Sequence, residues 1–357
     1  MKEISLMIGA MGLLLLLLRM WPRRKTGSKL KLLPSNWPKV SVIVPARNEE
    51  AMLGRLLDSL VALDYPELEV IVVDDCSTDR TFALASSYPI RVLSGRERPD
   101  GWHGKHWACH QGAEAARGDY LLFTDADTVH APESLRTAMI ELLASGSQGL
   151  TALPFHENPK FWERLSGPFY LLLLAATRPY GKAHPRQYFA IGQYLLFARS
   201  VYHSIGGHEA VRSIQAEDLA LAKQVLLKGG DWQVHTGKPF YTVRMYGSLV
   251  EFVRGWRRNF RAGVQMGPPW APIEMTLYIA ALAGAGYWKD PIAWALMGLT
   301  VMSMVPMQRR LGRFSLLGPL LWPFSIGLFC LVTILALYDS VFRRPLVWKN
   351  RKYAHAP

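Results

Sequence analysis

Acidic residues stand directly after two apolar segments of this sequence. Asp125-Ala-Asp127 follows the run Tyr120–Thr124, and Asp74-Asp75 ends an earlier run of the same kind. Two carboxylates at positions i and i+2 can bind one hard divalent cation and leave coordination sites open for phosphate oxygens. Such a cation stabilises the negative charge that grows on a diphosphate leaving group. We therefore expect Asp125 and Asp127 to hold Mn²⁺ or Mg²⁺ beside a diphosphate.

These acids need a sheet to bring them together, and the surrounding sequence predicts one. Short runs rich in β-branched residues have the length of buried strands, and the segments between them carry apolar residues at helical spacing. The expected strands are Val40–Pro45, Leu68–Val73, Ile90–Leu93 and Tyr120–Thr124, and the expected helices are Asn48–Leu63 with Asn48 as its cap, Thr78–Ser87 and Trp107–Arg117. This alternation predicts an α/β domain with a mostly parallel central sheet, in which ligands bind beyond the carboxyl ends of the strands.

Several common phosphate-binding and metal-binding classes are disfavoured. No G-x-G-x-x-G follows the first expected strand, and no G-x-x-x-x-G-K-[ST] occurs, which argues against a dinucleotide fold and a P-loop. The three cysteines are far apart and form no C-x-x-C, so no disulfide framework or cysteine zinc site is expected. His103, His106 and His110 lie close together, but no carboxylate or cysteine completes a convincing zinc-binding spacing.

The N-terminal end has the pattern of a membrane anchor. Ile4–Leu18 contains no charge, and basic residues from Arg19 to Lys31 follow it. A cleaved signal peptide would carry its positive charges before the apolar run, so it is the less favoured alternative. The positive-inside rule then places the following chain in the cytoplasm. The predicted division is an anchor at 1–22, a basic linker at 23–37, a soluble domain at 38–265, a membrane region at 266–342 and a basic tail at 343–357.

The C-terminal region contains three further hydrophobic segments, which are Ile273–Trp288, Pro291–Met307 and Phe314–Tyr338. Basic clusters follow the second and the third segment, and both clusters favour the cytoplasmic side. Three full spans cannot satisfy both clusters, so one segment is expected to be re-entrant or interfacial, and the sequence does not say which. A buried soluble helical domain is the alternative. Leu165–Thr177 is too short to span and is either an interfacial helix or a core helix.

Six motifs in the chain resemble the inverting family 2 glycosyltransferases, which have the GT-A fold. They are Val40-Ser-Val-Ile-Val-Pro-Ala-Arg-Asn-Glu-Glu50, Val73-Asp-Asp-Cys-Ser-Thr-Asp79, Gly104-Lys-His-Trp-Ala108, Thr124-Asp-Ala-Asp127, Ile205-Gly-Gly-His-Glu209 and Gln215-Ala-Glu-Asp218. The resemblance covers residues 38–265. The stretch 102–109 and the hydrophobic C-terminal region resemble the membrane-bound branch that glycosylates carotenoid acids such as diaponeurosporenoate. Hopanoid-associated and ceramide glucosyltransferase-like members are also similar.

The resemblance implies a role for each matching residue. Its donor-binding residues would be Pro45, Ala46, Arg47, Glu49, Asp75, Lys105 and Asp125, its metal ligands Asp125 and Asp127, and its catalytic base Asp218. Asp75 would hydrogen-bond the base of the nucleotide, and Lys105 would neutralise the diphosphate. A capping acid on the helix that follows is the bland alternative for Asp218. Glu217 and His208 lie in the same motifs, and His208 is a candidate for an acceptor or metal contact.

A basic segment after these motifs departs from the family pattern. Processive members carry Gln-x-x-Arg-Trp, whereas this chain reads Arg254-Gly-Trp-Arg-Arg-Asn-Phe260, which favours a single transfer over polymer synthesis. Arg257 and Arg258 are candidates for stabilising the leaving diphosphate. Trp256 among these arginines fits either an RNA-stacking patch or an interfacial helix on anionic lipid. The neighbouring apolar segments favour lipid, so no nucleic-acid partner is expected despite the net charge of +13.

The favoured function is metal-dependent inverting transfer of a hexose from a nucleotide-sugar to a lipid. UDP-glucose is the expected donor, and a carotenoid acid or another isoprenoid lipid is the expected acceptor. Ceramide, diacylglycerol and polyprenyl phosphate are alternative acceptors. Two other classes stay open, namely a sugar-phosphate nucleotidyltransferase, which normally shows a glycine-rich loop after its first strand, and a non-enzymatic membrane protein. The expected location is the cell membrane, with several spans and the catalytic domain in the cytoplasm.

Overall fold

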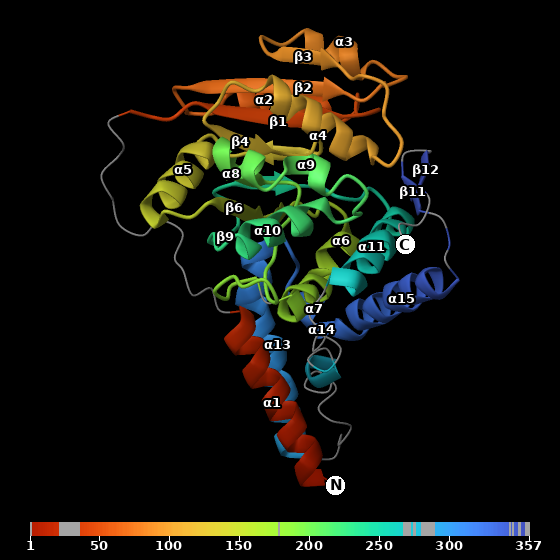
Figure 1. Cartoon of the computed structure of the whole chain (residues 1–357). Coiled ribbons are helices and arrows are strands. Elements are labelled where there is room, and N and C mark those ends of the chain that lie inside the picture. The colour runs from red at the N-terminus through yellow and green to blue at the C-terminus, as the bar shows by residue number, and fades with distance from the viewer. Residues whose placement is uncertain are drawn as a thin grey trace. The chain divides into compact units, whose positions relative to one another are not determined.

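The computed structural model describes residues 2–20, 36–177, 179–266, 273, 276–279, 290–342, 344, 346–348 and 351–353. The chain forms two compact units (Figure 1). The helical unit comprises residues 1–25, 155–189 and 246–342, and the sheet unit comprises 26–154, 190–245 and 343–357.

The sheet unit is built on seven strands in the order β3-β2-β1-β4-β8-β6-β9 (Figure 1). Their bounds are β1 Val40–Ala46, β2 Leu68–Asp74, β3 Arg91–Ser94, β4 Tyr120–Phe123, β6 Gly149–Leu153, β8 Leu195–Ala198 and β9 Trp232–Thr236. Strand β8 runs antiparallel to β4 and β6, and the other neighbouring pairs are parallel. The prediction of an α/β domain with a mostly parallel sheet is therefore confirmed. Two short strands, β5 (Thr128–His130) and β10 (Tyr241–Val243), pair antiparallel.

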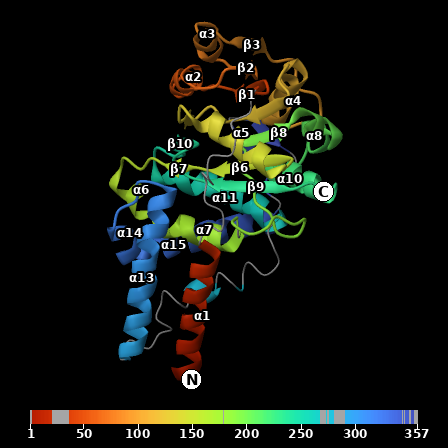
Figure 2. The ribbon, with the colours of Figure 1, turned by 90° about the vertical axis from the view of Figure 1, so that its left-hand side faces the viewer.

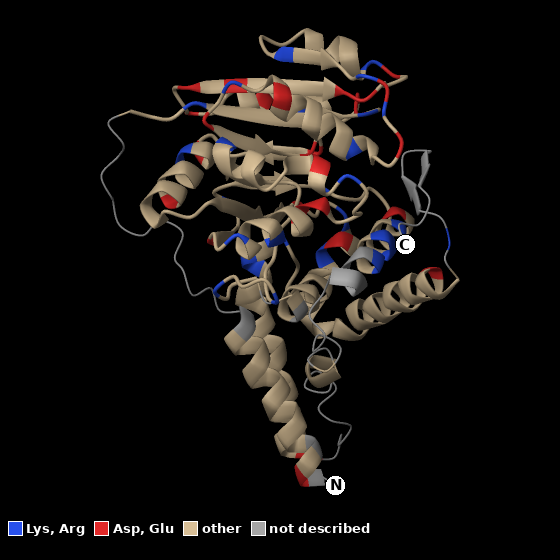
Figure 3. Cartoon of the chain, in the orientation of Figure 1, with Lys and Arg blue, Asp and Glu red and all other residues tan. Residues whose placement is uncertain are grey.

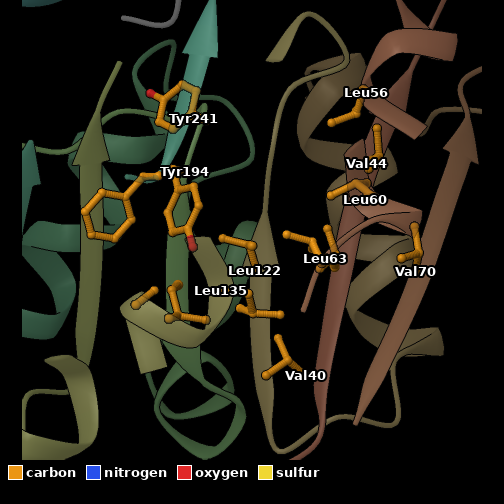
Figure 4. Packing of buried hydrophobic residues seen from close by; sticks show 14 of the residues in the cluster. Val40, Val44, Leu56, Leu60, Leu63, Val70, Leu122, Leu135, Tyr194 and Tyr241 are labelled. Carbon is orange, nitrogen blue, oxygen red and sulfur yellow. The ribbon is translucent and has the colours of Figure 1, made fainter. Parts of the chain in front are cut away.

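Helices pack on this sheet through their apolar faces. They are α2 Leu53–Val61, α3 Thr81–Ser86, α4 Gly104–Ala115, α5 Ser134–Ser145, α8 Arg199–Ser204, α9 Gly207–Ala210 and α10 Glu217–Leu227. Val40 and Val44 of β1 and Leu56 and Leu60 of α2 are fully buried in one hydrophobic cluster (Figure 4). Burying such side chains is the main driving force that holds α2 against the sheet.

Helix α2 begins five residues later than predicted. Asn48 has a left-handed backbone with φ 52°, so it cannot start the helix, and Met52 occupies the N-cap position instead. The Oδ1 atom of Asn48 accepts a hydrogen bond from Thr78 N at 2.8 Å. The expected capping residue therefore ties the loop after β1 to the loop after β2, which is a long-range contact that local spacing does not reveal.

The helical unit contains the apolar segments of the chain. Its helices are α1 Lys2–Met20, α6 Phe161–Leu165, α7 Gly167–Thr177, α11 Leu249–Met266, α13 Pro291–Leu311, α14 Leu317–Leu320 and α15 Trp322–Val341. Among the described residues, α13 and α15 are long and apolar enough to cross a membrane, by length and composition, and α1 holds a shorter apolar stretch, Leu6–Leu18. Most of the predicted segment Ile273–Trp288 and of the basic linker lies outside the described residues.

Helix α7 is a core helix of the helical unit. Phe169, Leu171, Leu172 and Ala175 have no solvent exposure. A helix that is hydrophobic on all sides is buried inside a protein rather than laid on a membrane surface. Of the two alternatives for Leu165–Thr177, the structure favours the core helix.

Candidate active site

The parallel strands bring the acidic loops to one edge of the sheet. Residue pairing places Ala46 of β1 opposite Asp74 of β2, and Ile43 of β1 opposite Phe123 of β4. The loops after β1, β2 and β4 therefore leave the sheet at the same edge, and Asp75 N donates to Ala46 O at 2.8 Å. This is the edge at which ligands bind in open α/β sheets.

Asp127 has a carboxylate oxygen that suits a bound cation. Its Oδ1 atom is buried and has no hydrogen-bond partner. Burial, reinforced by the negative charges of Asp125 and Glu49, raises the pKa of Asp127 to about 7. A buried acceptor without a donor is unfavourable, and a cation bound between Asp125 and Asp127 would satisfy it. The carboxylates therefore fit a divalent metal.

The protein would provide only part of such a metal's coordination. Among the described residues, no group of three or more His, Cys, Asp and Glu side chains could hold a metal ion. Mg²⁺ in phosphate-transfer sites is typically bound by one or two carboxylates, with substrate phosphates and water filling the remaining positions. Two aspartate ligands are therefore enough for a metal ion whose other ligands are diphosphate oxygens and water.

Lys105 lies between two carboxylates at this site. Its Nζ atom is 2.7 Å from Asp125 Oδ1 and 3.0 Å from Glu217 Oε1. Burial would lower the pKa of Lys105, but these two carboxylates raise it well above its usual value. Lys105 is therefore charged at neutral pH and can stabilise anionic groups that reach Asp125.

Glu217 holds the ammonium group of Lys105 in position. Its buried carboxylate bridges Lys105 and His106, with Oε2 at 3.3 Å from His106 Nε2. The other ring nitrogen of His106 faces Arg212 O at 3.1 Å. Burial would raise the pKa of Glu217, but Lys105 holds it well below its usual range. A permanently charged Glu217 thus sits next to Asp218 in the chain.

Asp218 is partly buried and has the pKa expected of a general base. Burial, together with the charge of Glu217, raises the pKa of Asp218 to about 7. Its Oδ2 atom accepts from Gly192 N at 2.9 Å and its Oδ1 atom from Leu219 N at 2.8 Å. The N-cap position of α10 belongs to Ala216, which has no side-chain cap. Asp218 therefore lies in the first turn of the helix rather than at its N-cap position.

Gly192 lies where these side chains converge, and we expect Gly192→Ala to weaken donor binding. A Cβ atom there would lie 2.8 Å from Lys105 Nζ, 3.2 Å from Glu217 Oε1 and 3.8 Å from Asp218 Oδ2. The flexible lysine would have to move away. Losing one charge-assisted hydrogen bond should weaken the binding of a nucleoside diphosphate by roughly tenfold or more, measured by calorimetry.

A matched control is Gly54→Ala in α2. A Cβ atom there meets Tyr88 Oη at 3.7 Å, which is an ordinary contact, so affinity should not change. Circular dichroism of both variants would verify folding. Wild-type affinity in folded Gly192→Ala protein would show that the position of Lys105 does not matter for the donor.

The predicted donor-binding residues divide into those that shape the loops and one that packs in the core. Arg47 donates through Nη1 to the carbonyl oxygens of Asp75 and Cys76, and so clamps the loop after β2 to the loop after β1. Glu49 N donates to Thr81 Oγ1 at 2.8 Å. The Ala46 side chain is 2% exposed and belongs to the hydrophobic core, so only its backbone faces the loop. Ala46 therefore stays a predicted donor-binding residue, and its backbone would make the contact.

His208 packs in the interior of the sheet unit. It is 1% exposed, its Nδ1 atom lies 2.8 Å from Tyr202 Oη, and its ring meets Phe123 at a centroid distance of 4.8 Å. Burial holds the pKa of His208 well below its usual value. These contacts give His208 a packing role and do not favour the acceptor or metal contact considered for it.

The three clustered histidines face different partners. His103 stacks on His106 at a centroid distance of 4.9 Å. His110 instead packs against Trp102 and Trp107. This arrangement gives no support to the zinc alternative.

Trp256, Arg257 and Arg258 belong to α11 in the helical unit. Trp256 is 8% exposed and packs against Phe169 at a centroid distance of 5.3 Å. A buried indole cannot stack on a nucleic-acid base, which removes the basis for the RNA alternative. Arg257 forms an ion pair with Asp339.

A buried polar network beneath the acidic turn had no recognisable signal in the sequence. Thr124 Oγ1 lies 2.9 Å from His130 Nε2, 3.0 Å from Thr128 Oγ1 and 2.8 Å from Gln193 O. Thr128 Oγ1 in turn donates to Asp125 O at 2.9 Å. Burial lowers the pKa of His130 to about 3, so it is neutral. Satisfied networks of this kind hold a turn in one geometry.

Comparisons with known proteins show the class of protein to which this fold belongs. Residues 41–206 match the family described as glycosyl transferase family 2. The chain resembles the mannosyltransferase PcManGT from Pyrobaculum calidifontis, solved in complex with GDP-Man and Mn²⁺, with 19% identity, a TM-score of 0.55, and coverage of 96% of this chain and 99% of that one. The chain therefore carries a family 2 glycosyltransferase domain with the GT-A fold, and it is a glycosyltransferase.

Curated relatives extend over nearly the whole chain. The 4,4'-diaponeurosporenoate glycosyltransferase of Staphylococcus aureus strain USA300 is 27% identical over 348 residues, which cover 93% of this chain and 92% of that protein. The protein of the same name from strain MRSA252 is 28% identical over 349 residues, with the same coverage. The similarity thus includes the helical unit as well as the sheet unit.

Proposed function

We propose that this glycosyltransferase moves a hexose from a nucleotide-sugar, UDP-glucose in the first instance, to a lipid acceptor of the carotenoid-acid type. The observation that carries this proposal is the similarity to 4,4'-diaponeurosporenoate glycosyltransferases over 93% of this chain, a span that includes the apolar helices. At 27% identity the reaction class is supported better than the particular acceptor.

The chemistry proposed for the site is a single inverting displacement. An acceptor oxygen forms a bond to C1 of the sugar while the bond from C1 to the diphosphate breaks, and the electron pair of that bond leaves with the diphosphate. A hydroxyl acceptor gives its proton to Asp218, whose pKa of about 7 suits this task. A carboxylic acid acceptor is ionised near neutral pH and needs no base.

Three side chains would help to stabilise the negative charge of the diphosphate. Asp125 and Asp127 would hold Mn²⁺ or Mg²⁺, which when bound supplies Lewis-acid stabilisation of the leaving group. Lys105 lies 2.7 Å from Asp125 Oδ1 and would donate to diphosphate oxygens placed next to that carboxylate. Glu217 keeps the ammonium group in position. Glu49, Arg47 and Asp75 would form the contacts with the nucleoside.

The proposed location is the cell membrane, with the sheet unit in the cytoplasm, where nucleotide-sugars are made. The apolar helices and the basic residues that follow Leu18 support it. The predicted bounds of anchor, linker, catalytic domain, membrane region and tail are part of the same proposal. A transfer to a lipid requires the acceptor to stay in the bilayer while its polar end reaches the soluble donor.

The proposal is tested by product formation in membranes that contain the full chain. Radiolabelled UDP-glucose, UDP-N-acetylglucosamine and GDP-mannose are each supplied with Mn²⁺ and with a carotenoid acid, ceramide, diacylglycerol or polyprenyl phosphate. We expect label from UDP-glucose in the carotenoid fraction, and none with the Asp127→Ala variant. Label in another lipid would correct the acceptor, and pyrophosphate release from a sugar phosphate and UTP would indicate a nucleotidyltransferase instead.

A further inference from the structure

Helix α15 is apolar and long enough to span a bilayer, but its neighbours in the helical unit are unusual for a spanning helix. Phe329, near its middle, packs against Phe260 of α11 at a centroid distance of 4.9 Å. Asp339, near the end of α15, accepts hydrogen bonds from Arg257 of α11. Helix α15 therefore contacts α11 both at its middle and at its last turns.

Helix α11 is too charged to lie in hydrocarbon. Its charged residues are Glu251, Arg254, Arg257, Arg258 and Arg261. Charged side chains near the centre of a bilayer are costly and rare. If α15 spanned, Phe329 would lie near the midplane, and Phe260 with its neighbours Arg257, Arg258 and Arg261 would lie there too. A position of α15 at the membrane surface avoids this.

Helices α1 and α13 of the same unit run in a different direction from α15. They lie side by side and run in the same sense (Figures 1 and 2), and a Cβ atom on Gly9 would touch Leu296 at 3.9 Å. Between its first residue and Arg309, α13 carries no charge, and Figure 3 shows the same uncharged length for most of α1. In Figure 1, α15 lies beside this pair and runs in a transverse direction. If α1 and α13 cross the bilayer, α15 lies along its surface.

The charge distribution agrees with this arrangement. Arg309, Arg310 and Arg313 stand at the end of α13, and the basic residues of 343–352 follow α15. Both clusters satisfy the positive-inside rule only if α15 returns to the side from which it started. A spanning α15 would place the two clusters on opposite sides.

Helix α15 also has one packed face and one uncovered apolar face. Ser325, Ile326, Val332 and Asp339 are buried in the unit. Phe324, Leu331 and Tyr338, which are seven residues apart and share one face, are 39%, 46% and 42% exposed. The packed face lies against the rest of the helical unit, so the uncovered apolar face is the one that can contact acyl chains.

We propose that α15 does not span the membrane and instead lies in the cytoplasmic surface of the bilayer, with the face of Phe324, Leu331 and Tyr338 in contact with acyl chains. Among the described helices, α1 and α13 cross the bilayer. The arginines of α11 then lie at the level of the anionic headgroups. This inference rests on the proposed membrane location and names which of the hydrophobic segments is interfacial.

The test measures the depth of three positions along α15. Phe324, Leu331 and Tyr338 are replaced singly by cysteine in a Cys76→Ser, Cys109→Ala, Cys330→Ser background, labelled with a nitroxide, and reconstituted as full-length protein into vesicles of phosphatidylcholine and phosphatidylglycerol. Oxygen and a nickel chelate report depth by electron paramagnetic resonance. We expect the same shallow depth at all three positions. Seven helical residues span about 10 Å, so a spanning helix would place Leu331 roughly 10 Å deeper than the other two.

The matched control is α13, labelled at Ile292 and Leu299. These positions are also seven residues apart and are 58% and 55% exposed. We expect Leu299 to lie deeper than Ile292. A graded depth in both helices would overturn the inference for α15 and leave the membrane location intact. No depth difference along α13 would instead contradict the membrane location itself.

Discussion

Asp127→Ala is expected to abolish turnover while leaving the protein folded. The reason is that Asp127 Oδ1 is a buried acceptor without a partner, beside Asp125, at the place where a divalent cation fits. Losing a metal that stabilises the leaving diphosphate removes several kcal/mol from the barrier reduction, which corresponds to roughly a thousandfold or more in rate. Turnover is measured with radiolabelled UDP-glucose at saturating Mn²⁺.

Binding measurements identify the cause of this loss. Calorimetry should show that Asp127→Ala binds UDP much more weakly than wild type in Mn²⁺, but almost equally in EDTA. The control is Asp64→Ala, because Asp64 is an exposed partner of Arg136 and surface ion pairs contribute little. Full activity of Asp127→Ala, or wild-type turnover that persists in EDTA, would place the reaction at another site.

Asp218→Asn is expected to lower turnover on a hydroxyl acceptor by at least ~100-fold, because a positioned general base contributes ~10²–10⁴ in rate. Asparagine keeps an oxygen that can accept from Gly192 N but cannot take a proton at neutral pH. Donor affinity should therefore survive. A carboxylic acid acceptor, which is already ionised, should suffer a much smaller loss, so the ratio between the two acceptors also helps to identify the natural one.

Stability separates a catalytic role from a structural one. The ordinary pKa of an aspartate is 3.8, and that of Asp218 in the folded protein is about 7. Between these pH values the folded state holds a proton that the unfolded state has lost, so this group makes the protein less stable as pH rises from about 4 to 7. Asp218→Asn should remove that dependence and be at least as stable as wild type at pH 7 in thermal unfolding.

The control for this variant is Asp231→Asn. Asp231 lies just before β9, where it accepts a hydrogen bond from Ser147 Oγ, and it takes no part in the proposed site. It should keep wild-type turnover on both acceptor types. Undiminished turnover of Asp218→Asn on a hydroxyl acceptor would refute the assignment of Asp218 as the base.

Local patterns were sufficient to predict the strands and the acids that follow them. Val40–Pro45 and Leu68–Val73 are short runs rich in β-branched residues, each with one polar residue (Ser41 and Glu69), and such runs are typical of buried parallel strands. Because parallel strands end at one edge, the position of Asp75 and Asp125 followed from the same pattern. The family resemblance added Lys105 and Asp218, which no periodicity indicates.

Contacts between distant parts of the chain decided the remaining features. Asn48 looks like a helix cap, but its backbone is left-handed and its side chain accepts from Thr78 N in another loop. His208 and Trp256 look like ligand-binding residues, yet both are buried by aromatic neighbours. Side-chain burial depends on what the fold places opposite a residue, and composition does not contain this information.

The sequence alone predicted an α/β domain between apolar ends, because strand pattern, acid spacing and hydropathy are local properties, and the resemblance of its motifs identified the domain as glycosyltransferase-like. The tertiary structure decided how the site works as a unit. It joined Lys105, Asp125 and Glu217 into one charged cluster, and it placed Gly192 so close to this cluster that a Cβ atom there would lie 2.8 Å from Lys105 Nζ. It also set α15 against the charged helix α11. Each of these outcomes depends on distances between residues far apart in the chain, and such distances exist only after folding.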